Sequence, residues 1–174
     1  MQNRAVVIFP DFSNLDIIKK IRNKYDPLSD FIKPHITLVF PFRSELSSIE
    51  IERHIQKAIN RMVPFELMMK GITANIEPLD NYIFLNIAIG FQEVSKLSKA
   101  LYSGILKQYQ SETYREKYLP HMTIGRLDKT KDYEQVINDI VLVHGETEFL
   151  SFVDSVSVVT ISDDKAATEM TIRL

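Results

Sequence analysis

One short pattern occurs twice in this chain, and its repetition constrains the fold more than any other feature. Residues 34–38 read Pro-His-Ile-Thr-Leu and residues 120–124 read Pro-His-Met-Thr-Ile. The two histidines, His35 and His121, lie 86 positions apart in a chain of 174 residues, so the copies are separated by about half its length. Each copy also follows a helical pattern and a loop. The repetition therefore predicts two similar lobes.

The chemistry of each copy depends on its being a β-strand. On a strand, residues two apart face the same side, so His35 and Thr37 would project together while the apolar residues between and after them enter the core. His121 and Thr123 would do the same. In a helix, each histidine and its threonine would point about 200° apart. If the two lobes face each other about an approximate two-fold axis, all four side chains converge.

The rest of the chain alternates between strand-like and helix-like apolar spacing. We predict strands near residues 4–9, 35–40, 65–72, 82–89, 118–124, 147–153, 155–161 and 168–174, and helices near 15–25, 47–62, 94–109 and 133–140. Ser13, followed by Asp16, resembles the capping box of the first helix. No long linker divides the chain, so we expect a single domain over residues 1–174, of class α+β with mainly antiparallel strands and a midpoint near Gly90.

The composition narrows the class of protein. Hydrophobic residues make up 45% of the chain, and the net charge of −2 gives no sign of a polyanion-coating protein, so any contact with nucleic acid is expected to be local. Without cysteine the chain cannot form a disulfide, a thiolate zinc site or a cysteine nucleophile, which suits a reducing compartment. No segment resembles a signal peptide or a membrane helix. We therefore expect a cytoplasmic protein that does not enter a membrane.

The four polar side chains of the two motifs suit in-line attack on phosphorus. Histidine has an ordinary pKa of about 6.5, so one imidazole can act as general base while the other, protonated, acts as general acid. The threonine hydroxyls can donate hydrogen bonds to non-bridging phosphate oxygens. This chemistry requires neither a metal nor a cofactor, and we expect neither. The other histidines, His54 and His144, are not spaced like local metal ligands and are expected to be solvent-side residues.

The paired motifs resemble the H-x-[ST]-hydrophobic signatures of the 2H phosphoesterase superfamily, which includes the bacterial proteins called 2′-5′ RNA ligases and the cyclic nucleotide phosphodiesterases. The flanks are similar too, in the leading prolines, in residues 38–42 after the first motif and in Gly125-Arg126 after the second. The resemblance covers essentially the whole chain. It implies a bilobal fold, in which two pseudo-symmetric lobes with mainly antiparallel sheets face a central cleft and the helices lie outside.

The resemblance also implies roles for individual residues. It implies catalysis by His35 and His121, and phosphate binding by Thr37 and Thr123. The residues leave open which histidine is the base, although the cyclic phosphodiesterases of the family favour His121 as the base that activates water. Strict strand alternation would place Arg126 on the opposite side from the second motif's polar side chains. Further candidates for substrate binding are aromatic and basic residues close to the motifs in sequence or in the expected sheet: Phe42, Arg43, Tyr82, Tyr118 and Arg126.

The expected reaction is metal-independent hydrolysis of a 2′,3′-cyclic phosphate at an RNA end or in a nucleotide, leaving a 2′-phosphate. We expect a monomer that takes part in RNA processing. Because no clear basic cluster is present, the expected partner is a nucleotide or a short RNA with a cyclic phosphate end, not a long RNA. Two alternatives stay open. One is a module that binds nucleotides or RNA ends with little turnover, and the other is 2′-5′ RNA ligation, the reverse of the same chemistry.

Overall fold

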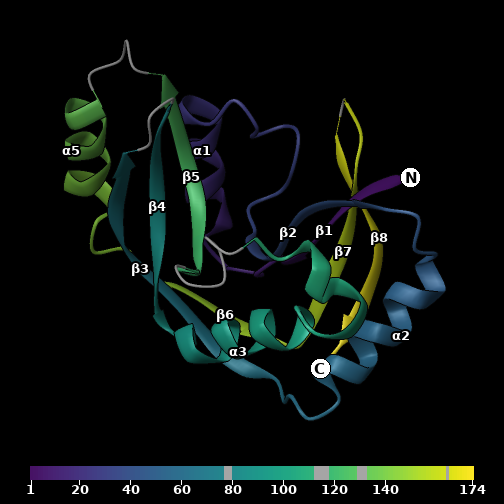
Figure 1. Ribbon diagram of the computed structural model, residues 1–174. Helices are drawn as coiled ribbons and strands as arrows, with labels where there is room; N and C mark the ends of the chain where they lie inside the picture. Colours follow the sequence, from purple (N-terminus) through teal and green to yellow (C-terminus); the bar gives the residue numbers. More distant parts are fainter. Residues whose placement is uncertain (77–79, 112–117, 129–132, 164) are drawn as a thin grey trace.

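The computed structural model describes residues 1–76, 80–111, 118–128, 133–163 and 165–174 (Figure 1). The predicted α+β class with antiparallel strands is confirmed. The predicted helix over 94–109 is divided into an α-helix and a 3-10 helix. In chain order the elements are β1 (Gln2–Ile8), α1 (Leu15–Tyr25), β2 (Ile36–Ser44), α2 (Ser48–Ile59), β3 (Phe65–Ile76), β4 (Asp80–Ile89), α3 (Phe91–Leu101), η1 (Gly104–Tyr109), β5 (His121–Asp128), α5 (Tyr133–His144), β6 (Phe149–Val153), β7 (Ser155–Ile161) and β8 (Ala166–Arg173).

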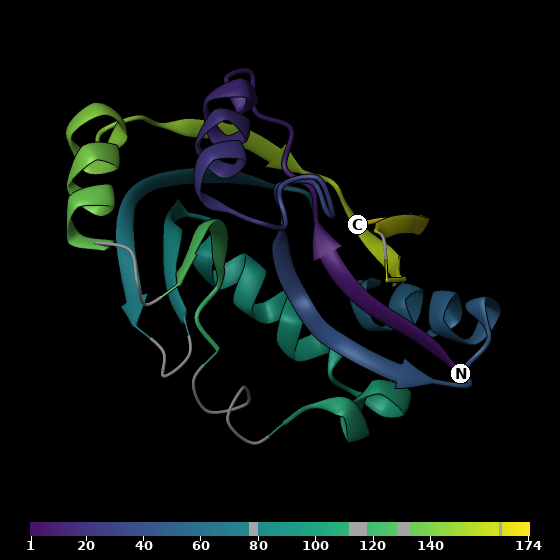
Figure 2. The same cartoon turned by 90° about the horizontal axis from the view of Figure 1, so that it is seen from above.

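The described strands form one curled 8-stranded sheet in the order β6-β3-β4-β5-β2-β1-β7-β8. Figure 2 shows the curl from above, with the bent β3 (dark teal) on one side and the long β2 (blue) and β1 (purple) on the other. Each half contains a strand-helix-strand unit, β1-α1-β2 or β4-α3-β5, and the strands that carry the motifs, β2 and β5, are neighbours at the centre. Gly90 lies between β4 and α3. The two expected halves are therefore joined through one continuous sheet.

Each unit's helix packs against the motif strand of the other half. Helix α1 contacts β5, and α3 contacts β2. The core beneath the motifs contains Ile36 and Met122, both 0% exposed. Burying side chains of this size contributes about 1.5–3 kcal/mol each. A slip of one residue along either strand would turn these apolar side chains out and the motif's polar ones in, so their burial sets the register.

The helix starts show where local sequence signals hold and where they fail. The predicted capping box at Ser13 is wrong, because α1 has Asn14 as its N-cap residue with no side-chain capping bond, and Asp16 instead pairs with Lys20 at 3.3 Å. A capping box does start α2, where Ser47 accepts from the backbone N–H of Glu50 and the Glu50 carboxylate accepts from that of Ser47. Among the described helices, none combines the length and apolarity needed to cross a bilayer.

Candidate active site

The pairing of β2 with β5 brings the two motifs together. Ile36 pairs with Met122 in antiparallel register. Extending that register by one residue in each direction sets His35 opposite Thr123, and the threonine of the first motif opposite the histidine of the second. Directly opposed residues face the same side of a sheet, so the four polar side chains share the face opposite to Ile36 and Met122. We call this the motif face.

The register also sets the spacing of the two histidines. His35 and His121 are diagonal neighbours across the strand pair, and such neighbours lie about 7–8 Å apart. This separation suits a phosphorus atom placed between two imidazoles, each hydrogen-bonded to one of the two apical oxygens. The burial pattern is the same in both copies: the proline and the apolar residues are buried, while the histidine and the threonine are half-buried.

Both imidazole rings are oriented in the same way. Nδ1 of His35 lies 2.8 Å from the Lys33 carbonyl oxygen, and Nδ1 of His121 lies 2.8 Å from the Leu119 carbonyl oxygen. A carbonyl oxygen can only accept a hydrogen bond, so Nδ1 must carry the proton that is donated. This tautomer leaves Nε2 of each ring to accept or deliver a proton.

The surroundings keep both imidazoles neutral. Burial lowers the pKa of His35 to about 4, and the positive charges of Arg22 and His121 lower it too, against the raising effects of the Lys33 carbonyl and Asp26. Burial also lowers the pKa of His121, while its backbone hydrogen bond acts in the opposite direction. At neutral pH both rings are therefore uncharged in the unliganded protein. A bound phosphodiester anion would raise both pKa values, because opposite charge favours the protonated form.

Phe84 is a site residue that sequence reasoning missed. Its ring stacks on the imidazole of His121, with centroids 3.6 Å apart and planes inclined at 22°. Phe84 reaches this place because it pairs with Thr123 across β4 and β5. The first motif has a looser counterpart, since Phe9 meets His35 edge-on with centroids 6.3 Å apart. Nothing in the sequence marks Phe84, because the strand pairing alone brings it beside the second motif.

The prediction for Arg126 from strict alternation is wrong. The register between β4 and β5 shifts just after Thr123, where Ile124 is the extra residue of a β-bulge. The shift returns Arg126 to the motif face, where it pairs with Tyr82 and its guanidinium carbon lies 5.9 Å from the centre of that ring. Tyr82 in turn lies beside Phe84, with ring centroids 6.2 Å apart. Two of the weaker candidates therefore join the motif side chains.

The other three substrate-binding candidates lie elsewhere. The Tyr118 hydroxyl donates to the Thr37 carbonyl oxygen at 2.7 Å, and burial raises the pKa of Tyr118, so this side chain ties the two motif segments together. Phe42 is 4% exposed and packs in the core against Tyr109, with centroids 5.0 Å apart. Arg43 is exposed near the far end of β2, about 20 Å from Thr37 at the usual rise of a strand. Neither Phe42 nor Arg43 is brought together with the histidines.

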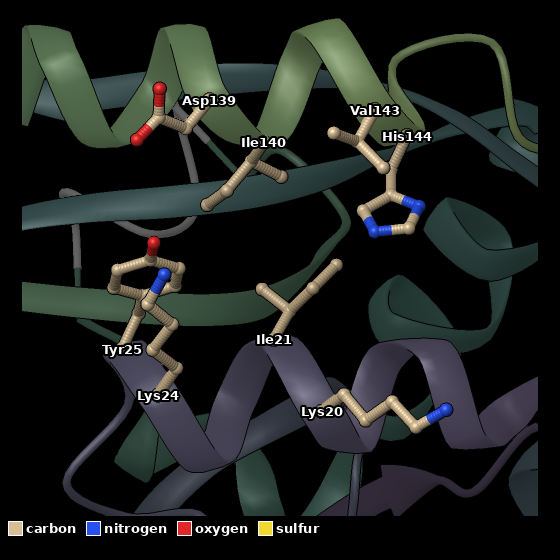
Figure 3. Close-up of a pocket in the computed structure, with 8 residues that line it drawn as sticks. All are labelled: Lys20, Ile21, Lys24, Tyr25, Asp139, Ile140, Val143 and His144. Carbon is tan, nitrogen blue, oxygen red and sulfur yellow. The ribbon is translucent and has the colours of Figure 1, made fainter.

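The remaining histidines also lie outside the motif face. His54 is half-buried, with Nε2 2.9 Å from the Leu101 carbonyl oxygen, so it links α2 to α3 and is not the solvent-side residue that we expected. His144 borders a cavity of about 280 Å³ between α1 and α5, shown in Figure 3. The other residues lining it are Lys20, Ile21, Lys24, Tyr25, Asp139, Ile140 and Val143. Across the described ranges, no three histidine or acidic side chains gather as metal ligands.

Comparison with known proteins shows the family to which the chain belongs. The profile of the 2′-5′ RNA ligase superfamily matches residues 9–165. The chain therefore belongs to that superfamily, and its predicted likeness to the 2H phosphoesterases is confirmed.

Individual proteins resemble this chain in sequence or in fold. A Bacillus licheniformis protein named "Putative phosphoesterase" is 28% identical over 139 residues, which cover 78% of each chain. Among solved structures, E. coli LigT in its apo form has a TM-score of 0.66 at 14% identity, covering 99% of this chain and 97% of LigT. LigT complexed with 3′-AMP has a TM-score of 0.64 at 17% identity, covering 99% of this chain and 95% of LigT. At these identities the likeness to LigT shows the fold.

Proposed function

We propose that this protein is a metal-independent phosphodiesterase that opens 2′,3′-cyclic phosphates at RNA ends or in nucleotides, leaving a 2′-phosphate. The observation that carries the proposal is the Ile36–Met122 pair, which sets each motif histidine opposite the threonine of the other copy. Membership of the 2′-5′ RNA ligase superfamily supports it. So do the phosphoesterase name of the Bacillus relative and the complex of LigT with 3′-AMP, a nucleotide with its phosphate on the ribose 3′ oxygen.

We assign the base to His35 and the acid to His121, which reverses the order that the family resemblance favours. Burial lowers the pKa of both rings, and the neighbouring charge of Arg22 further opposes protonation of His35, against the raising effects of the Lys33 carbonyl and Asp26. When the anionic substrate binds, His121 therefore takes up a proton more readily, and neutral His35 is left to accept one.

The reaction then balances as one in-line displacement. Nε2 of His35 takes a proton from water as the water oxygen forms a bond to phosphorus. The bond from phosphorus to the 3′ oxygen breaks, and Nε2 of His121 gives its proton to that oxygen. The product is a 2′-phosphomonoester, and the two rings exchange their protons with solvent before the next turnover.

The hydroxyls of Thr37 and Thr123 are proposed to donate to the non-bridging oxygens, where negative charge grows in the transition state. Arg126, returned to the motif face by the bulge, adds a positive charge on the side of the second motif. The net charge of −2 favours a nucleotide or a short RNA end as substrate over a long RNA, whose binding would require many phosphate contacts. We propose that the protein acts on such ends as a monomer.

The test is hydrolysis by purified protein, with EDTA present, of 2′,3′-cyclic mononucleotides, cyclic-ended oligonucleotides and 2′-5′ dinucleotides. His35→Ala and His121→Ala should each lose about 100- to 10,000-fold in kcat, the range ascribed to general acid–base catalysis. His144→Ala, in the cavity between α1 and α5, is the matched control and should retain activity. Wild-type turnover that survives in both motif variants would refute the assignment. Tight nucleotide binding without turnover of any substrate would favour a binding module instead.

A further inference from the structure

Each motif histidine takes its orientation from the carbonyl group two residues before it, so the segment leading into each motif must be held in place. The two leading segments are held differently. Before the second motif, the neutral hydroxyl of Tyr118 donates to the Thr37 carbonyl oxygen at 2.7 Å. Before the first motif, the segment is held by a buried charged pair, Arg22 and Asp26, which are 3% and 6% exposed.

All three nitrogens of the Arg22 guanidinium donate hydrogen bonds that attach residues 26–32 to the end of α1. Nε donates to Oδ2 of Asp26 at 2.7 Å, Nη1 to the Ile32 carbonyl oxygen at 2.7 Å and Nη2 to the Leu28 carbonyl oxygen at 3.0 Å. The second oxygen of Asp26 accepts from the Leu28 backbone N–H at 2.9 Å. A buried ion pair is expensive to desolvate, so it often adds little net stability compared with apolar side chains of similar volume. This pair fixes the path of residues 26–32.

That path ends at the group that orients the first imidazole. Ile32 precedes Lys33, and the Lys33 carbonyl oxygen is the acceptor of the His35 Nδ1–H bond at 2.8 Å. We propose that Arg22, held by Asp26, is the positioning residue of His35, and that it sets the direction of the imidazole through the backbone of Ile32 and Lys33. This inference rests on the proposed function for its effect on turnover. Its effect on the ring of His35 can be measured without any substrate.

The charges of the pair act on His35 as well. The charged groups that influence its protonation are Arg22 and Asp26 at the end of α1 and His121 on β5. Arg22 opposes the positive charge on the imidazole, and Asp26 favours it. Removing the carboxylate alone therefore leaves a buried cation uncompensated beside His35.

The chain offers a matched control for Arg22. Arg4 is 1% exposed, its Nε donates to Glu169 at 2.6 Å and its Nη1 donates to the Leu46 carbonyl oxygen at 2.9 Å. Lysine retains the charge of arginine but cannot reproduce its planar set of donors. Arg22→Lys and Arg4→Lys should therefore lower the thermal unfolding midpoint by similar amounts. Only Arg22→Lys should alter the orientation of the His35 ring.

The experiment measures both variants by steady-state kinetics and by NMR of the histidine rings. In Arg22→Lys we expect kcat to fall about 10- to 100-fold with KM within about twofold, as for a misplaced catalytic group. The single Nδ1–H tautomer of His35 should be lost while the resonances of His121 stay. Arg4→Lys should keep wild-type kcat and ring resonances. If Arg22→Lys does the same despite its loss of stability, the residue is merely structural and the proposal is overturned.

A second variant covers the case in which Arg22→Lys does not fold. Asp26→Asn keeps an acceptor for the Leu28 N–H but removes the carboxylate that holds Nε of Arg22 at 2.7 Å, so the single Nδ1–H tautomer of His35 should be lost while the resonances of His121 stay. A His35 ring that keeps its wild-type resonances would contradict the proposal. If the wild-type protein hydrolyses no cyclic phosphate, the proposed function fails, and NMR of the histidine rings still decides the role of Arg22.

Discussion

The two motif copies have the same local geometry and different surroundings. In both, the histidine and threonine are half-buried between buried apolar residues, and Nδ1 lies 2.8 Å from the carbonyl oxygen two residues back. Around His35 lie the buried pair of Arg22 and Asp26 and the edge of Phe9. Around His121 the charged pair is replaced by the stacked ring of Phe84.

A second difference follows each threonine. The register of β2 with β1 shifts after Thr37 just as that of β5 with β4 shifts after Thr123, so both copies have a bulge at the same place. Two positions after the extra residue of the bulge, the first copy has Phe40 and the second has Arg126. The repeat thus determines which atoms are presented, while the neighbours determine their charge. Two motifs with the same histidine and threonine can in this way take different roles in one reaction.

The largest expected effect tests that division of roles. A phosphodiester with a 4-nitrophenolate leaving group needs no proton on the departing oxygen. Activity of His121→Ala on such a substrate should recover most of the loss of about 100- to 10,000-fold seen on a cyclic phosphate, because only the acid is missing. His35→Ala should recover little, because water still lacks its base. Comparing kcat/KM of both variants on both substrates checks this, and recovery by His35→Ala alone would reverse our assignment.

The threonines should give the next largest effect. Thr37→Val and Thr123→Val keep the shape of the side chain and remove the donor, so each should lower kcat by about 100-fold, as for the loss of one donor to a developing oxyanion. We expect the smaller loss for Thr123→Val, because Arg126 lies close to it on the same face. Steady-state kinetics on one cyclic nucleotide measures the difference. Equal losses in the two variants would argue against a phosphate role for Arg126.

The pH profile should show the two histidines separately. His35 must be neutral and His121 protonated, so kcat/KM should rise as pH increases through the His35 pKa of about 4. As the pH rises further, kcat/KM should fall with a midpoint below pH 6.5, because burial lowers the pKa of His121 from its ordinary value. An optimum on the acidic side of neutrality is therefore expected. A profile of kcat/KM that keeps rising above pH 7 would exclude this assignment.

The aromatic neighbours should have smaller effects, of unequal size. Phe84→Leu removes the ring stacked on His121 and admits water, so the pKa of His121 should rise toward its ordinary value. Phe9→Leu should change the pKa of His35 less, because the Phe9 ring meets the imidazole only at its edge, at 6.3 Å. NMR titration of both rings measures the two shifts. A larger shift from Phe9→Leu would contradict the structural difference between the copies.

The smallest expected effect is on stability. The pKa values of His35 and His121 are lower in the folded protein than in the unfolded chain, so the unfolded chain takes up protons first as the pH falls below about 6.5. Their neutral forms therefore support folding fully above that pH, and the folded state loses stability as the pH falls toward 4. A His35→Gln/His121→Gln variant should show a shallower loss in urea unfolding between pH 6.5 and 4. If the free energy of unfolding of the variant and of the wild type fell in parallel with pH, the two histidines would not contribute to the pH dependence of stability.

Much of the fold followed from local patterns. The strand-helix order was predicted because period-two and helical apolar spacing are local properties of the backbone, and the repeat predicted the two matching units. Capping was predicted less well. Ser13 and Asp16 have the spacing of a capping box, but the lysine one turn on competes for the carboxylate, and the helix begins at Leu15 without a side-chain cap.

The sequence predicted four polar motif residues as the candidate site, and the register of β2 with β5 places these four on one face. The surroundings of these residues were predicted less well. Phe42 has an aromatic ring that could stack on a base. A further register shift between β1 and β2, however, points its side chain toward the core. Arg126 was expected on the wrong face, because a bulge depends on the partner strand and not on the strand's own sequence. Phe84 has no marker in the sequence, because strand pairing alone places it beside His121. Arg22 and Asp26 have the i,i+4 spacing of a helical ion pair, but that spacing does not reveal the contacts of Arg22 with the Leu28 and Ile32 carbonyl groups.

The sequence by itself determined which atoms the two motifs offer, because the alternation of side chains along a strand is set by the backbone. Tertiary structure decided which of them meet. The register of β2 with β5 joins residues 86 positions apart, and it is held by burial of Ile36 and Met122 against helices from both halves. Packing over such separations depends on the whole chain at once, and so do the different surroundings of His35 and His121.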